Sequence, residues 1–116
     1  MIKTAEQMIN EAQADIHCVD AKEAKCLFDT DPDAFIIDVR EADSVAKSKL
    51  TASHHISRGL LEMKIHKLSS DPDSLILTHC GGGGRASLAA QTLQNMGYRD
   101  VYAITDTFEH IKTLFG

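Results

Sequence analysis

The chain has 116 residues, of which 43% are apolar and 25% are charged, the composition of one ordinary globular domain. Its net charge of −5 argues against nucleic acid as the main partner, and no segment reaches the roughly 18 apolar residues of a membrane-spanning helix. The N-terminal segment mixes charged and apolar residues, so we expect no secretory signal. Three cysteines without framework spacing indicate a reducing, cytoplasmic setting.

The first half of the chain is predicted to alternate helices with strands. Thr4 with Gln7, and Asp20 with Glu23, have the spacing of capping boxes, which open helices. The nearly continuous apolar run over residues 34–39 is typical of a strand covered on both faces. The expected elements are a helix over 4–14, a strand over 16–19, a helix over 20–28, a turn over 29–33, a strand over 34–39 and a short helix over 41–47.

The second half continues this alternation. Its expected elements are a short strand near 55–56, a helix over 59–68, a turn over 71–73, a buried strand over 75–79, a helix over 86–96 stopped by Gly97, a strand over 101–104 and a helix over 106–115 capped by Asp106. Such alternation predicts a mostly parallel sheet with helices on both faces. Ligands of such sheets bind beyond the carboxyl ends of the strands, which is where Cys80 falls.

A cysteine, four glycines and an arginine, residues 80–85, join the buried strand to the next helix. Glycine is costly to order, but without side chains the loop N–H groups can converge at the helix N-terminus and form an anion nest. A thiol held there is stabilised as a thiolate, and Arg85 would add a positive charge at the rim. The pattern predicts that Cys80 is a nucleophile that carries an anionic group, such as a persulfide, without a metal or organic cofactor.

The alternative interpretation of this loop is a flexible turn beside a small buried cysteine. Glycines of a flexible turn rarely lie between a buried strand and a well-formed helix, so the interpretation of the loop as an active site is favoured. No Gly-Lys-Ser/Thr closes the loop, which excludes a Walker-type phosphate loop. There is no CxxC pair, and His54-His55 is interpreted as surface or packing histidines, so no metal site is predicted. Cys18 and Cys26 are predicted to be structural.

Three stretches resemble the single-domain rhodanese-like sulfurtransferases of the thiosulfate or polysulfide type. They are IDVRE at 37–41, RGLLE at 58–62 and the loop and helix at 80–98, and the likeness extends from about Ile16 to Lys112. The cysteine loop is its most specific part. The sequence departs from the family at 48–53, where the family often has Gly-His-Ile-Pro-Gly-Ala, and at 106–107, where it often has Gly-Gly. These departures bear on loop geometry and substrate access.

The resemblance implies a three-layer α/β sandwich around a mostly parallel five-stranded sheet. Cys80 would accept a sulfane sulfur from an anionic donor, thiosulfate or polysulfide, and pass it to a thiol, cyanide or a protein acceptor. Arg58 would supply a second cation near the pocket, and Asp38 with Arg40 would form an ion pair rather than contact substrate. The persulfide would be cradled by the amides of Gly81, Gly82, Gly83, Gly84 and Arg85, and Arg85 would also bind the donor.

Two other functions remain open at this point. A phosphatase or arsenate reductase on the same scaffold usually has five residues between its cysteine and arginine, whereas four separate Cys80 from Arg85. A non-catalytic binding or regulatory module is disfavoured by the presence of Cys80. The N-terminal helix, residues 1–14, could pack on its own domain or on a second copy, so both a monomer and a homodimer are compatible with the sequence.

Overall fold

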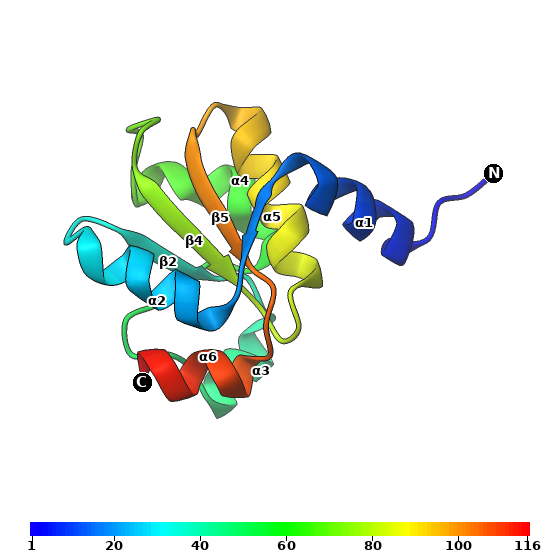
Figure 1. Cartoon of the computed structure of the whole chain (residues 1–116). Helices are drawn as coiled ribbons and strands as arrows, with labels where there is room; N and C mark the ends of the chain where they lie inside the picture. The colour runs from blue at the N-terminus through cyan, green and yellow to red at the C-terminus, as the bar shows by residue number, and fades with distance from the viewer.

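A five-stranded sheet lies between two layers of helices in the computed structural model, which describes residues 1–116 (Figure 1). The strand order is β1-β5-β4-β2-β3, and all four neighbouring pairs are parallel. The predicted α/β sandwich is therefore confirmed. The strands are β1 His17–Val19, β2 Phe35–Asp38, β3 His54–His55, β4 Leu75–His79 and β5 Asp100–Ile104.

The helices cover both faces of the sheet. One face packs against α4 and α5, with α1 lying on α5, and the other packs against α2 and α6 (Figure 1). The predicted capping boxes at Thr4 and Asp20 are both present. The helices are α1 Ala5–Asp15, α2 Ala21–Thr30, α3 Ala42–Lys47, α4 Leu61–Lys64, α5 Gly84–Met96 and α6 Phe108–Phe115, with 3-10 turns η1 Arg58–Leu60 and η2 Ile65–Lys67. None is long and apolar enough to cross a membrane.

Several element boundaries differ from the sequence prediction, among them the end of α2, which extends to Thr30 into the turn expected over 29–33. The helix expected over 59–68 is divided into η1, α4 and η2, and only Leu61 and Ile65 of its apolar residues are fully buried. Helix α5 begins two residues early, so that Gly84 and Arg85 form its first turn rather than the end of the loop. Helix α6 is capped by Thr107 and not by Asp106.

The alternation of side chains along β4 determines which layer each functional residue faces. Every residue of this central strand is buried. Ile76 and Cys80 belong to the core on the α5 side, whereas Leu77 belongs to the core on the α6 side. His79 points to the same side as Leu77, where its ring stacks on Phe108 of α6. The strand therefore places Cys80 and His79 on opposite faces of the sheet.

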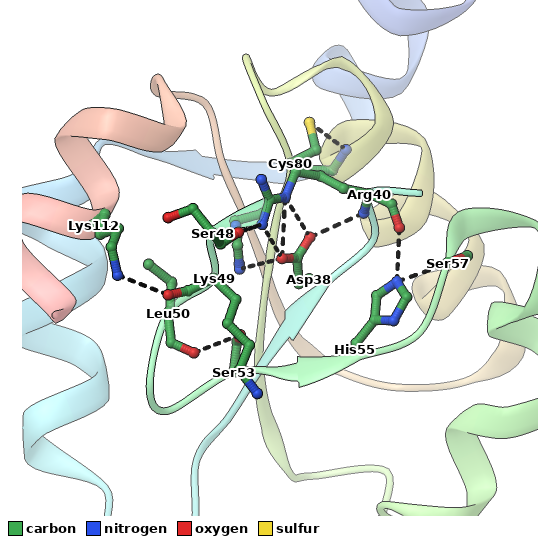
Figure 2. Close-up of polar contacts among 12 residues, drawn as sticks. Asp38, Arg40, Ser48, Lys49, Leu50, Ser53, His55, Ser57, Cys80 and Lys112 are labelled. Carbon is green, nitrogen blue, oxygen red and sulfur yellow. Dashed lines mark hydrogen bonds and ion pairs between the residues drawn. The ribbon is translucent and has the colours of Figure 1, made fainter. Parts of the chain in front are cut away.

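A buried ion pair joins the end of β2 to its neighbours. The Arg40 guanidinium donates to Asp38 from Nε at 3.0 Å and from Nη2 at 2.8 Å, and Nη2 also donates to the Ser48 carbonyl at 2.6 Å (Figure 2). The same guanidinium lies 3.9 Å from the centre of the Phe108 ring. The predicted Asp38–Arg40 ion pair is confirmed, and it connects β2 with the loop after α3 and with α6.

Helix α1 packs on its own domain. Its Ala12 is fully buried, and Gln91 and Gln94 of α5 donate their side-chain amides to the Asp15 carboxylate and carbonyl at 3.2 and 3.1 Å. The sequence was compatible with packing on its own domain or on a second copy, and in this structure the helix packs on its own domain.

Removing Arg40 is expected to lower the free energy of unfolding by about 3–5 kcal/mol, because the Asp38 charge would stay buried without a partner. Arg40→Met keeps most of the side-chain volume, and urea unfolding at pH 7 measures the loss. Arg99→Met is the matched control, since its pair with Asp73 is exposed and such pairs contribute little. Equal losses in the two variants would contradict the importance given to the buried pair.

Candidate active site

The strand order creates a topological switch point at the carboxyl ends of β2 and β4. The chain leaves β2 toward β3 on one side and leaves β4 toward β5 on the other, so the connections diverge between these two neighbours. Such a switch point is where ligands bind in open parallel sheets. Asp38 pairs with His79 in the sheet register. Arg40 lies two residues after Asp38, and Cys80 follows His79 directly; Figure 2 shows Asp38, Arg40 and Cys80 near one another. The predicted nucleophile therefore lies at the position that this fold uses for binding.

The sulfur of Cys80 accepts two main-chain N–H groups. Gly83 donates at 3.1 Å and Ala86 at 3.4 Å, and the Cys80 residue is only 2% exposed. Both donors lie at the N-terminal end of α5, where the helix dipole is positive. Of the amides expected from Gly81 to Arg85, only that of Gly83 donates to the sulfur, and the Ala86 donor was not predicted. This arrangement stabilises negative charge on the sulfur.

Gly83 is the glycine that the backbone requires. It is the N-cap of α5 with φ of 102°, and a Cβ on it would lie 2.9 Å from the Cα of Thr105. Side chains are rarely found in that conformation and could not fit in that space. Gly81 and Gly82 are exposed and have negative φ, and a Cβ on Gly82 would meet nothing within 4 Å. The outer side of the loop is therefore open.

Arg85 lies beside the loop, as the sequence predicted. It is half-buried in the first turn of α5, and its Nη2 is 4.0 Å from the position that a Cβ on Gly81 would occupy. Its guanidinium forms no hydrogen bond or ion pair within the chain, whereas those of Arg40, Arg58 and Arg99 are all paired. Arg85 can therefore bind an anion that enters over the loop without first breaking an internal contact.

Arg58 is not brought to the sulfur. Its guanidinium donates to Thr92 Oγ1 at 2.7 Å and to Glu62 at 3.1 Å. Thr92 is eight residues beyond Gly84 in α5, which is about 12 Å along the helix axis. The short 3-10 turn that begins at Arg58 directs the side chain to the middle of α5, where Glu62 neutralises its charge.

A buried cluster on the opposite face of the sheet was not predicted. His79 is fully buried, neither of its ring nitrogens has a hydrogen-bond partner, and Nε2 lies 3.9 Å from Asp38 Oδ2. Its ring stacks on Phe108 with centroids 6.1 Å apart, and the main-chain N–H of Phe108 donates to the Gly81 carbonyl at 3.2 Å. Through the hydrogen bond from Phe108 to Gly81, the cluster thus supports the cysteine loop from the α6 side of the sheet. A histidine inside the continuous apolar run of β4, whose side chains alternate between the two faces of the sheet, was the signal that could have found it.

The charges in this cluster follow from its burial. Burial, helped by the Arg40 charge and opposed by Asp38, lowers the pKa of His79 from 6.5 to about 4. Burial would raise the pKa of Asp38, but the hydrogen bonds and charge of Arg40, together with His79, bring it below its ordinary value. At neutral pH, Asp38 is therefore an anion paired with Arg40, and His79 is uncharged.

Comparison with known families agrees with this geometry. The family model of the rhodanese-like domain matches residues 20–113. The chain belongs to the rhodanese-like domain family. It is 30% identical over 77 residues to the thiosulfate sulfurtransferase GlpE of Coxiella burnetii, covering 66% of this chain and 70% of that protein. It is also 30% identical over 73 residues to the putative sulfur carrier protein YrkF of Bacillus subtilis, covering 63% of this chain but only 38% of YrkF.

Two solved structures place the whole rhodanese-like chain in context. A protein of unknown function from Rhodopseudomonas palustris, named as a possible tyrosine phosphatase, has a TM-score of 0.83 at 28% identity and covers 100% of this chain and 94% of its own. The polysulfide-sulfur transferase homodimer of Wolinella succinogenes has a TM-score of 0.74 at 30% identity, covering 88% of this chain and 77% of its own.

The two departures from the rhodanese pattern have structural roles in this chain. In the 48–53 segment, the Ser48 carbonyl accepts from Arg40 and Leu50 is fully buried in the core. At 106–107, the Asp106 carboxylate accepts the main-chain N–H of Ala21 at 3.0 Å, and Thr107 caps α6. At 106–107, side chains therefore provide contacts where the family often has glycine, whereas Ser48 contributes its main-chain carbonyl.

The other two cysteines are not core residues. Cys18 and Cys26 are both exposed, in contrast to the buried Cys80. Cys18 lies on β1, which is an edge strand of the sheet, and Cys26 lies on α2 beside a groove that Val19 also lines. Both are therefore surface residues rather than core residues, and their structural role stays a prediction. No group of three or more His, Cys, Asp or Glu side chains is arranged to hold a metal ion.

The stability of the protein is expected to fall between pH 6.5 and pH 4. The unfolded chain takes up a proton on residue 79 near pH 6.5, whereas folded His79 resists it until about pH 4. Above pH 6.5 the uncharged His79 makes its full contribution to the free energy of unfolding. By pH 4, roughly 3 kcal/mol of this contribution is lost. Protonation of Asp38, whose pKa is lowered, acts only below this window.

Urea unfolding of the wild type and of His79→Phe at several pH values between 4 and 7 measures this contribution. Phenylalanine keeps a ring that can stack on Phe108 but cannot be protonated, so the variant should lose most of the slope. An unchanged slope would show that His79 is not the group responsible.

Proposed function

We propose that this protein is a sulfurtransferase that carries a sulfane sulfur as a persulfide on Cys80. The observation that carries the proposal is the buried sulfur that accepts the N–H groups of Gly83 and Ala86 at the positive end of α5. A persulfide is anionic at its terminal sulfur, so the same donors favour it. The family, and the names of the Coxiella and Wolinella relatives, support this chemistry.

The reaction proceeds in two displacements that need no external oxidant. The Cys80 thiolate attacks the sulfane sulfur of the donor, forming Cys80–S–S⁻ and releasing sulfite from thiosulfate, or a polysulfide shortened by one sulfur. A thiolate or cyanide then attacks the terminal sulfur, takes it as a persulfide or thiocyanate, and returns Cys80 as the thiolate. The main-chain donors stabilise negative charge in both forms of the residue.

Arg85 is the group that would select an anionic donor. Its guanidinium is unpaired and lies beside the exposed Gly81, so a donor anion can approach the sulfur across the open side of the loop. Arg58 is held on Glu62 and Thr92 and adds no second charge there. Thiosulfate and polysulfide both satisfy one cation. A single domain over residues 1–116, a cytoplasmic location and a protein acceptor remain predictions.

A phosphatase is the second candidate, favoured by the name of the Rhodopseudomonas structure. An anion nest with an arginine would also hold a phosphate ester. The loop has four residues between Cys80 and Arg85, which suits a smaller group than a tetrahedral oxyanion. Hydrolysis of a chromogenic phosphate ester faster than sulfur transfer would favour the phosphatase over the sulfurtransferase.

Exposure to thiosulfate or polysulfide is expected to add about 32 Da, one sulfur atom, to the peptide that contains Cys80. Cyanide should remove this sulfur as thiocyanate. Cys80→Ser should abolish both signals, while Cys26→Ser, which removes an exposed thiol, should retain them. Mass spectrometry and a thiocyanate assay measure the two steps. Equally slow transfer by the wild type and Cys80→Ser would contradict the sulfurtransferase proposal.

Arg85→Gln is expected to slow sulfur capture from thiosulfate about 10- to 100-fold, because a charge-assisted contact to the donor is lost. The effect should appear in kcat/KM for the donor. Arg58→Gln is the matched control and should leave capture nearly unchanged, since that guanidinium contacts Glu62 and Thr92. If the two variants lose capture equally, Arg85 is not the donor-binding cation.

A further inference from the structure

Helix α1 lies outside the residues that the family model matches, yet it packs on α5, the helix that the cysteine loop enters (Figure 1). The Cδ1 atom of Ile9 is 2.9 Å from the position that a Cβ on Gly84 would occupy, so α1 fills the space over the first turn of α5. A side chain at position 84 would require Ile9 to move from this position. The N-terminal helix is therefore built against the element that carries the loop amides.

A continuous chain of hydrogen bonds runs from α1 to the cysteine sulfur. The Gln13 side-chain amide donates to Ser87 Oγ at 3.0 Å, and this hydroxyl donates to the Gly83 carbonyl at 2.6 Å. The main-chain N–H of Gly83 then donates to Cys80 Sγ at 3.1 Å. Ser87 is fully buried, so its one proton is committed to Gly83, and its hydroxyl can only accept from Gln13.

We propose that α1 is a positioning element for the sulfur-carrying loop, and that Gln13 is its positioning residue. The inference rests on the proposed sulfur transfer. Gln13 orients the Ser87 hydroxyl, which holds the left-handed Gly83 residue and so aims one of the two N–H groups at the sulfur. Donors that are already oriented stabilise charge without reorganising during the reaction, so a loosened Gly83 should slow sulfur capture.

Gln13→Glu tests this chain because the substitution reverses one hydrogen bond without changing the size of the side chain. An ionised carboxylate can only accept, so it would draw the Ser87 proton away from the Gly83 carbonyl. Gln91→Glu is the matched control. Gln91 also ties α5 to α1, through Asp15, but it does not contact the loop. Both substitutions weaken the packing of α1 on α5. Only Gln13→Glu alters the hydrogen bonds that lead to the Cys80 sulfur.

The expected result is a kcat for sulfur transfer lowered about fivefold or more in Gln13→Glu, the size of one lost hydrogen bond, with little change in KM for thiosulfate. KM should be spared because Arg85 is untouched. Gln91→Glu should lose at least as much thermal stability and keep its kcat. Wild-type kcat in both variants, or equal losses in both, would overturn the proposal. Gln13→Met, which only removes the donor, gives the same comparison if Gln13→Glu does not fold.

A second measurement does not depend on sulfur transfer. Amide hydrogen exchange at Gly83, followed by NMR, should be about fivefold faster in Gln13→Glu than in the wild type and unchanged in Gln91→Glu. If the wild type acquires no sulfur but Gly83 exchange responds in this way, the proposed function fails while the link from α1 to the loop stands. Unchanged exchange at Gly83 overturns the link itself.

Discussion

The structure is organised around two main-chain N–H groups that point at one buried sulfur. Gly83 and Ala86 can both donate to Cys80 only if the chain turns sharply after β4 and enters α5 at once. The left-handed conformation of Gly83 makes that turn, and its closeness to Thr105 leaves no room for a side chain. The remaining features of the site serve to keep this turn in place and to supply charge near it.

The turn is secured from both faces of the sheet. On one face, Phe108 donates its main-chain N–H to the Gly81 carbonyl, and its ring contacts the Arg40 guanidinium and stacks on His79. On the other face, Ser87 donates to the Gly83 carbonyl and accepts from α1. The carbonyls of Gly81 and Gly83 are thus bound by residues outside the loop. These bonds fix the loop in the conformation in which the Gly83 N–H points at the sulfur. A buried ion pair and a buried uncharged histidine are acceptable here because together they anchor α6 over the end of β4.

The distribution of arginines gives this acidic chain a local positive charge at the site. Three of its four arginines are neutralised, Arg40 by Asp38, Arg58 by Glu62 and Arg99 by Asp73. The fourth, Arg85, has no internal partner and lies beside the exposed side of the loop. An anionic donor is therefore drawn to one place on a protein whose net charge is −5.

Local patterns in the sequence determined the order of helices and strands, the two capping boxes, the Asp38–Arg40 pair and the place of Cys80 at a strand end. Each depends on residues a few positions apart, whose spacing sets periodicity, caps and turns. Tertiary packing decided the rest. Asp106 and Thr107 could both cap α6, but Asp106 is used by the N–H of Ala21, 85 residues away. The partners of Arg58, the burial of His79 against Phe108, and the bond from Gln13 to Ser87 likewise join residues far apart in the chain, because they depend on which faces meet when the layers pack.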